Sequence, residues 1–143
     1  NIIGKQNNSI NFSNDDLEEV YSSRTFCLFE EIEIIKKRGL AKGGSLQNAI
    51  VVDKEKVLNE NGLRNEKEFV NHKILDLAGD FLLSGYRILG TVNCYQGGHQ
   101  LSNLFLRKLM KSKSSFVEIE LNNNIVLTKK TELRQSVKIA VNA

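Results

Sequence analysis

The sequence contains no proline and only two cysteines in 143 residues. The two cysteines, Cys27 and Cys94, each lie within an apolar, strand-like run. A disulfide framework requires more cysteines than this, and a thiolate metal site requires closely spaced pairs. We therefore expect two unpaired, buried thiols, which suit a reducing compartment, and a cytoplasmic location.

Long apolar runs are also absent. No stretch approaches the roughly 20 apolar residues that a transmembrane helix needs, so we expect no transmembrane segment. The chain opens with Asn1 rather than methionine, shows no signal-peptide pattern and contains no low-complexity linker. We interpret it as a fragment or a processed piece of a longer protein. Its length and its 41% of hydrophobic residues are enough for one domain with a core.

A strong charge of one sign is missing as well. The net charge is +3, from 20 basic and 17 acidic residues. The two signs are interleaved along most of the chain, as in residues 30–38. Basic residues do not cluster with aromatic ones, so we expect a mixed, solvated surface and no nucleic-acid partner.

The hydrophobic pattern mixes strands with helices. Helical spacing or capping signals mark residues 13–21, 30–38, 65–84 and 99–111. Strand-like composition marks residues 10–12, 24–29, 49–52, 57–58, 86–95 and 116–121. This order predicts an α+β fold, with helices packed on one face of a mostly antiparallel sheet and an inserted strand–helix–strand unit over residues 24–53. The domain is expected to cover residues 1–121, and residues 122–143 to form a C-terminal tail.

The helix expected over residues 65–84 has the clearest signals. Asn65 followed by Glu68 resembles a capping box, in which each side chain bonds the backbone of the other residue. Apolar residues at helical spacing predict a core-facing stripe in each of the two long helices. The stripe residues are Val70, Ile74, Leu77 and Phe81 in the first, and Leu101, Leu104, Phe105 and Leu109 in the second.

Three titratable residues share one side of the first long helix. At about 100° per residue, His72, Asp76 and Asp80 fall within about 80° of one another. A histidine and an aspartate at positions i and i+4 can reach one cation, and both are good zinc ligands. The same spacing is also common for a hydrogen-bonded surface pair. Catalytic zinc needs three protein ligands, and no third residue has a persuasive spacing, so both interpretations stay open.

The other histidine, His99, follows two glycines and opens the second long helix. A helix N-terminus disfavours the imidazolium, so a carboxylate partner is needed to hold a proton there. Asp80 is the candidate if the two helices pack side by side. His99 could equally serve only as a helix cap.

Two further side chains have a chemical and a structural interpretation. Lys73 could meet a phosphate as a point charge, or it could be a solvated surface lysine. Thr25 could donate a hydrogen bond to an oxyanion, or it could be only a structural residue of its strand.

Seven ordered motifs together resemble one family. They are Arg24-Thr25-Phe26, Gly39-Leu40 with Gly43-Gly44-Ser45, Val57-Leu58-Asn59, Gly62-Leu63-Arg64, Glu68-Phe69-Val70, the run from His72-Lys73 through Asp76 to Asp80, and Gly98-His99. From about Ile10 to Leu109 the chain resembles the second half of the zinc-dependent UDP-3-O-acyl-N-acetylglucosamine deacetylases of lipid A biosynthesis.

The resemblance implies a role for each polar residue of the pattern. His72 and Asp76 would be ligands of Zn²⁺, and His99 the general acid that protonates the leaving amine or steadies the oxyanion. Asp80 would orient and charge His99, and Thr25 would lie beside the oxyanion.

The resemblance also implies how the substrate, UDP-3-O-acyl-N-acetylglucosamine, is bound. Lys73 would lie near the sugar and diphosphate, and Phe26 would line the glucosamine pocket. The strand–helix–strand unit would shape a hydrophobic passage for the acyl chain. The residues expected to line that passage are Ile32, Ala41, Leu46 and Val51.

The family has two similar α+β halves with the active site between them. Its third zinc ligand, a histidine, and its base, a glutamate, lie in the first half, which is expected to be the partner of this chain. The isolated chain should therefore bind zinc weakly and lack useful deacetylase activity. The alternative is a non-catalytic α+β module whose polar helix face is only solvated.

Overall fold

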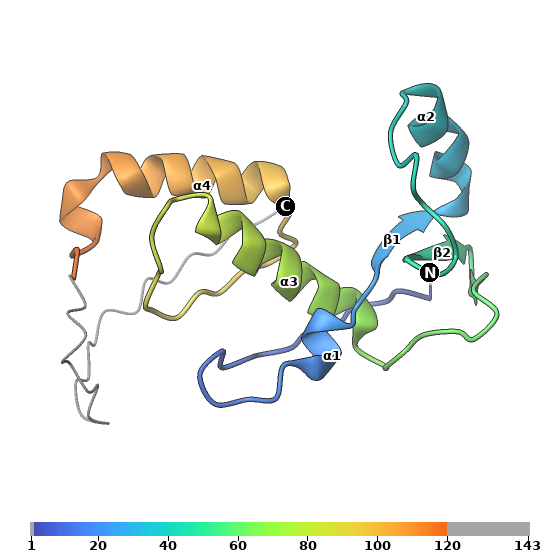
Figure 1. The fold of residues 1–143 in the computed structure, drawn as a ribbon, viewed down its shortest axis with the longest axis horizontal. Coiled ribbons are helices and arrows are strands. Elements are labelled where there is room, and N and C mark those ends of the chain that lie inside the picture. The colour runs from blue at the N-terminus through green and yellow to red at the C-terminus, as the bar shows by residue number, and fades with distance from the viewer. Residues whose placement is uncertain (1, 120–143) are drawn as a thin grey trace. The chain divides into compact units, whose positions relative to one another are not determined.

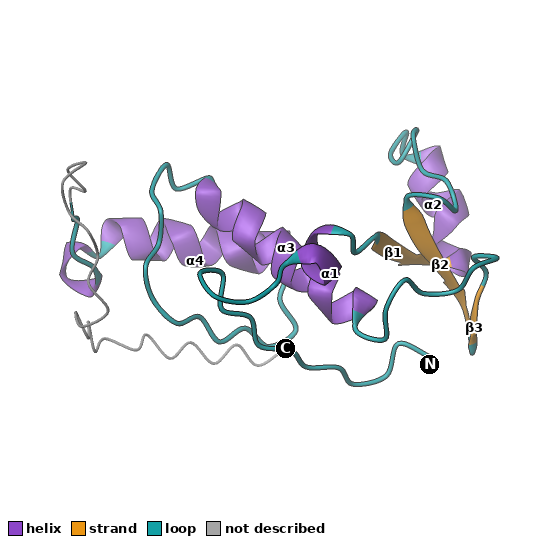
Figure 2. Ribbon diagram, turned by 60° about the horizontal axis from the view of Figure 1, so that its bottom comes forward, coloured by secondary structure: helices purple, strands orange, loops and turns teal. Residues whose placement is uncertain are grey.

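Three strands form one sheet in the order β1–β2–β3 (Figure 2). The structure, a computed structural model, describes residues 2–119. β1 (Thr25–Leu28) and β2 (Ala49–Asp53) pair in parallel, whereas the short β3 (Lys56–Val57) pairs antiparallel with β2. The described sheet is therefore mixed, and its expected antiparallel character is not confirmed.

The parallel pairing follows from the connection between β1 and β2. That connection contains the 3₁₀ turn η1 (Phe29–Glu31) and helix α2 (Ile32–Lys37), seen beside the strands in Figure 1. Parallel neighbours need such a crossover, whereas a tight turn joins antiparallel ones. The strand–helix–strand order predicted for residues 24–53 is present, and its status as an insertion stays a prediction. The α+β class is confirmed.

The central strand β2 carries the core of the first of two compact units, Asn1–Asp76. Ile50 and Val52 are 0% and 1% exposed and cluster with Phe69. Val51, on the opposite face of the strand, is also buried. Burial on both faces is typical of a central strand with a continuous apolar run.

Helix α3 (Glu68–Leu82) is the predicted long helix with a later start. Asn65 accepts a hydrogen bond from the backbone N–H of Lys67, but Glu68 does not complete a capping box. Its carboxylate instead accepts from the side chain of Arg24, 44 positions earlier in the chain. The predicted capping box was wrong because the carboxylate of Glu68 forms a buried ion pair with Arg24 instead.

The predicted stripe of α3 is half-buried rather than buried. The fully buried residues of α3 are Glu68, Phe69 and Asn71. The amide of Asn71 lies against another polar residue, accepting a hydrogen bond from Asn8 at 2.7 Å. The most deeply buried residues of α3 therefore lie outside the predicted apolar stripe, and two of them, Glu68 and Asn71, are polar. The spacing of apolar residues cannot reveal such buried polar positions.

In the second unit, Leu77–Ala143, helix α4 (His99–Lys111) has the predicted bounds. Phe105 packs against Phe81, with ring centroids 5.5 Å apart. The predicted stripe needs one correction: Leu104 is 56% exposed, whereas Leu106 is 6% exposed. No helix in residues 2–119 is long and apolar enough to cross a membrane.

Two predicted strands, residues 10–12 and 86–95, are absent from the structure. Their composition favours strands, but a strand also needs a neighbour with which to pair. Residues 116–119 form no strand either, and the rest of that prediction and the tail at 122–143 lie outside the described residues. The helix expected over 13–21 is reduced to α1 (Glu18–Tyr21).

Both cysteines are free, as predicted, but their burial differs from the prediction. Cys27, in β1, is half-buried, and Cys94 is exposed. Cys94 is exposed because residues 86–95 form no strand that would bury alternate side chains.

Candidate functional site

His72 and Asp76 stand one turn apart on α3 with their side chains in contact. The Nε2 atom of His72 lies 3.3 Å from Oδ1 of Asp76, and the two side chains are 13% and 17% exposed. Nδ1 of His72 lies 3.3 Å from the backbone carbonyl oxygen of Ser23. A carbonyl oxygen only accepts hydrogen bonds, so this contact assigns a proton to Nδ1.

With this proton on Nδ1, the lone pair of a neutral imidazole lies on Nε2, and Nε2 faces the carboxylate oxygen Oδ1 of Asp76. Two acceptors at this separation need a proton or a cation between them. A histidine whose other nitrogen donates to a backbone carbonyl is the usual form of a metal ligand, because that bond fixes the ring and its tautomer. His72 and Asp76 therefore fit two of the three protein ligands of a catalytic zinc.

A third ligand is not found within the described part of the chain. In residues 2–119, no group of three histidine, cysteine or carboxylate side chains is placed to hold a metal ion. The donor set thus has the right chemistry for zinc and falls one residue short of a complete site.

Lys73 and Phe26 adjoin this pair. The Nζ atom of Lys73 lies 3.1 Å from Oδ2 of Asp76 and 5.3 Å from the centroid of the Phe26 ring. The Phe26 ring also meets Phe69 and His72 edge to face, with centroids 5.1 and 6.2 Å apart. Phe26 thus supports the imidazole and faces the lysine, while Lys73 partly balances the charge of Asp76.

The other predicted site residues, catalytic and substrate-binding, differ in exposure. Thr25, at the start of β1, is exposed, as are Ala41 and Leu46. Ile32 is half-buried, and Val51 is 7% exposed. Their predicted roles at the oxyanion and in the acyl passage stay predictions.

In the second unit, His99 and Asp80 are in contact. Nδ1 of His99 lies 2.9 and 3.0 Å from the two carboxylate oxygens of Asp80. The carboxylate fixes the proton on Nδ1, so Nε2 is left available, and His99 is 71% exposed while Asp80 is 14% exposed. This geometry suits a histidine that exchanges a proton through Nε2 with a molecule from outside.

The sequence analysis missed a buried ion pair beside His72. Arg24 and Glu68 are 8% and 0% exposed, and Nε of Arg24 donates to Oε1 of Glu68 at 2.7 Å. Both residues belong to the quoted motifs, and Glu68 precedes His72 by one helical turn. The position of Glu68, one turn before His72 on the same helix, was the signal in the sequence that could have indicated its link to the site.

The ion pair shifts the pKa values of both partners. Burial by itself raises the pKa of Glu68, but hydrogen bonds from the Arg24 side chain and from the backbone N–H groups of Arg64 and Arg24 outweigh it and lower the pKa. The hydrogen bond to Glu68 raises the pKa of Arg24. Glu68 is therefore held as the carboxylate in the folded chain.

This lowered pKa predicts a loss of stability in acid. The contribution of Glu68 is full above its unfolded pKa near 4.5 and disappears as pH falls through the lower folded value. In urea unfolding series from pH 7 to 3, Glu68→Gln should be less stable than the wild type at pH 7. The gap in unfolding free energy should narrow below about pH 4.5. A gap that stays constant over this range would contradict the assignment.

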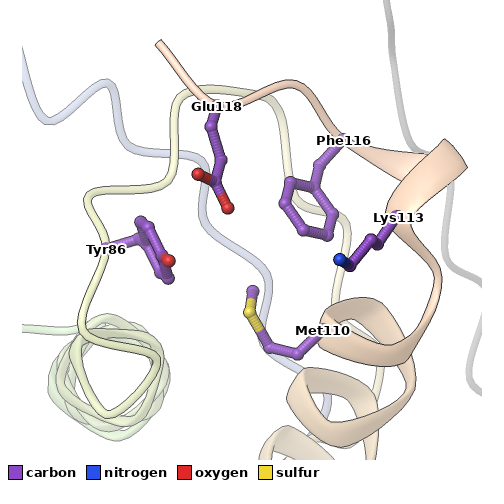
Figure 3. A pocket seen from close by; sticks show the side chains of 5 residues that line it. All are labelled: Tyr86, Met110, Lys113, Phe116 and Glu118. Carbon is purple, nitrogen blue, oxygen red and sulfur yellow. The ribbon is translucent and has the colours of Figure 1, made fainter. Parts of the chain in front are cut away.

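A cavity of about 500 Å³ lies elsewhere in the second unit (Figure 3). Its lining mixes aromatic, thioether and charged side chains. The lining residues are Tyr86, Met110, Lys113, Phe116 and Glu118. None of the predicted site residues belongs to this set, so the cavity gives no support to the predicted chemistry.

Comparison with known proteins identifies the relatives of the chain. Residues 1–111 match the family model described as UDP-3-O-acyl N-acetylglycosamine deacetylase. Proteins named UDP-3-O-acyl-N-acetylglucosamine deacetylase from Psychrobacter arcticus and Teredinibacter turnerae are 43% and 46% identical over 84% and 76% of the chain. One of that name from Campylobacter lari is 40% identical over 86% of it. The matched regions span 38%, 36% and 42% of these relatives, respectively.

Proposed function

The chain belongs to the UDP-3-O-acyl N-acetylglycosamine deacetylase family, and from this premise we propose that it carries part of the active site of a zinc-dependent amide hydrolase. The substrate we propose is UDP-3-O-acyl-N-acetylglucosamine, whose acetamide is hydrolysed in lipid A biosynthesis. The proposal rests on the contacts of the His72 imidazole. Its Nδ1 lies 3.3 Å from the carbonyl oxygen of Ser23, and its Nε2 lies 3.3 Å from Oδ1 of Asp76.

His72 and Asp76 would hold the zinc ion through Nε2 and a carboxylate oxygen. A bound zinc ion polarises the amide carbonyl and lowers the pKa of a coordinated water. The carbonyl of Ser23 keeps the imidazole in the tautomer that can bind a cation. The third ligand and the base that accepts the proton of the water would come from the part of the protein outside these 143 residues.

His99 would act as the general acid. Asp80 accepts the Nδ1 proton and stabilises the imidazolium, so that Nε2 can carry a second proton. That proton passes to the departing nitrogen as the C–N bond breaks, which gives a free amine and acetate.

The remaining predicted residues would bind the substrate or, in the case of Thr25, take part in catalysis. We assign Lys73 to the sugar and diphosphate and Phe26 to the glucosamine ring, supported by the contact of the lysine with the ring face. Thr25 would donate to the oxyanion. The acyl chain would run along the strand–helix–strand unit, past the residues Ile32, Ala41, Leu46 and Val51.

A non-catalytic module is the second candidate, because the described residues contain no third zinc ligand. Substituting Asp76 or His99 in the complete protein separates the two. If the chain forms part of the enzyme, each alanine variant loses deacetylation of UDP-3-O-acyl-N-acetylglucosamine. Deacetylation that survives both changes would reject the site.

The isolated 143-residue chain is expected to bind zinc weakly and to show no useful turnover. Two ligands leave the ion without the third protein donor that a catalytic site has. Equilibrium dialysis against zinc, with the His72→Ala chain as a control, measures this. One tightly held zinc per chain together with full deacetylase turnover would contradict the expectation.

A further inference from the structure

One peptide unit, between Ser23 and Arg24, is held at both ends by helix α3. Its carbonyl oxygen lies 3.3 Å from Nδ1 of His72, and its N–H donates to Oε1 of Glu68 at 3.1 Å. The two groups of a trans peptide point in opposite directions. Glu68 and His72 are one turn apart, a rise of about 6 Å, so a single peptide plane can bridge them along the helix.

The carboxylate of Glu68 is itself fixed by several donors. Besides the contact of its Nε, Arg24 donates from Nη2 to Oε2 of Glu68 at 3.0 Å and to the carbonyl of Gly62 at 2.9 Å. The backbone N–H of Arg64 donates to Oε2 at 2.6 Å. With 0% of its surface exposed, Glu68 is confined to this position.

The side chain of Arg64 also binds the backbone next to the Ser23–Arg24 peptide. Its Nη1 donates to the carbonyl of Ser22 at 2.5 Å, and its Nη2 to the carbonyl of Gln47 at 3.3 Å. Successive carbonyls of residues 22 and 23 therefore have different partners. This arrangement resists rotation of the Ser23–Arg24 peptide.

We propose that Arg24 and Glu68 are positioning residues for the zinc site, acting on His72 through the Ser23–Arg24 peptide. The ion pair holds the peptide so that its carbonyl accepts from Nδ1, which keeps the lone pair on Nε2, directed toward Asp76, where the two residues would hold the zinc ion. The inference rests on the proposed role of His72 as a zinc ligand. It adds to that role the reason why the ring has one tautomer and one orientation.

The test uses the complete protein with Glu68→Gln. This change keeps the side-chain volume but places an NH₂ donor where a carboxylate oxygen accepted hydrogen bonds. Arg24→Lys keeps the charge and removes the guanidinium fork, and it carries the test if the first variant does not fold. Ile50→Ala is the control for general loosening of the core, since Ile50 belongs to the buried cluster of the same unit and makes none of the hydrogen bonds that hold the Ser23–Arg24 peptide. Circular dichroism checks that each variant is folded.

Two measurements are needed besides activity. The first measurement is zinc affinity, determined by competition with a chelator. Glu68→Gln and Arg24→Lys should each lower the affinity about 10- to 100-fold, as is typical when a group that orients a metal ligand is changed. The affinity of Ile50→Ala should stay unchanged. In the metal-free protein, the ¹⁵N shifts of His72 should report an Nδ1–H tautomer in the wild type and a mixture of tautomers in the two variants.

The outcomes separate this inference from the proposed function. If His72→Ala leaves zinc affinity unchanged, the proposed function fails and the inference fails with it. If His72→Ala abolishes zinc binding while the Glu68 and Arg24 variants keep wild-type affinity and the wild-type tautomer, only the positioning role is overturned. Equal losses in the Ile50→Ala control would reduce the effect to general stability and also overturn it.

Discussion

Replacing His72 with alanine in the complete protein is expected to remove the bound zinc and reduce deacetylation about a thousandfold or more. In the proposed site the imidazole would supply one of the two zinc ligands of this chain, and the carbonyl of Ser23 accepts from its Nδ1. A bound zinc ion contributes several kcal/mol of transition-state stabilisation, and each ~1.4 kcal/mol corresponds to a tenfold rate. Asp76→Ala should have the same effect through the second ligand.

Zinc per molecule, measured by atomic emission after dialysis, checks this prediction beside the deacetylation rate. Glu66→Gln is a suitable control, because it removes an exposed carboxylate shortly before the start of α3. The control should keep both zinc and activity. A His72→Ala protein that retains one zinc ion and near wild-type turnover would exclude His72 as a ligand.

Replacing His99 with alanine is expected to lower kcat about 10²- to 10⁴-fold while zinc stays bound. The ring contacts Asp80 through Nδ1 and is otherwise largely exposed, so its removal should cost little stability. Asp80→Asn should also lower kcat, because the amide is a poor partner for an imidazolium.

A variant with both His99 and Asp80 replaced tests whether the two residues act together or independently. If Asp80 acts only through His99, then His99→Ala combined with Asp80→Asn should be little slower than His99→Ala alone. Gln100→Ala, at the exposed neighbour of His99, is the control and should keep wild-type kcat. Losses that multiply in the double variant would show that the two residues act separately.

The elements that local sequence determines were predicted well. Helix α4 has its predicted bounds because two glycines precede it and its apolar residues have helical spacing. The contact between His99 and Asp80 was anticipated from electrostatics, since an imidazolium at a helix N-terminus needs a carboxylate. The run in β2 was recognisable as a strand from its β-branched residues.

The features that depend on distant partners were not predicted. Glu68 fits a local capping pattern equally well, and only the fold brings Arg24, 44 positions away, to its carboxylate. Residues 86–95 have the composition of a strand, but composition does not supply a neighbouring strand. The hydrogen-bond acceptor that Ser23 provides for His72 is a backbone carbonyl oxygen, which no side-chain motif can reveal.

The most direct measurement compares zinc content and release of the free amine from UDP-3-O-acyl-N-acetylglucosamine in the same samples of the complete protein. Wild type, Asp76→Ala and His99→Ala are needed. We predict that Asp76→Ala loses both zinc and amine release, whereas His99→Ala keeps zinc and loses amine release. Amine release close to the wild-type rate in both variants would contradict the proposed site.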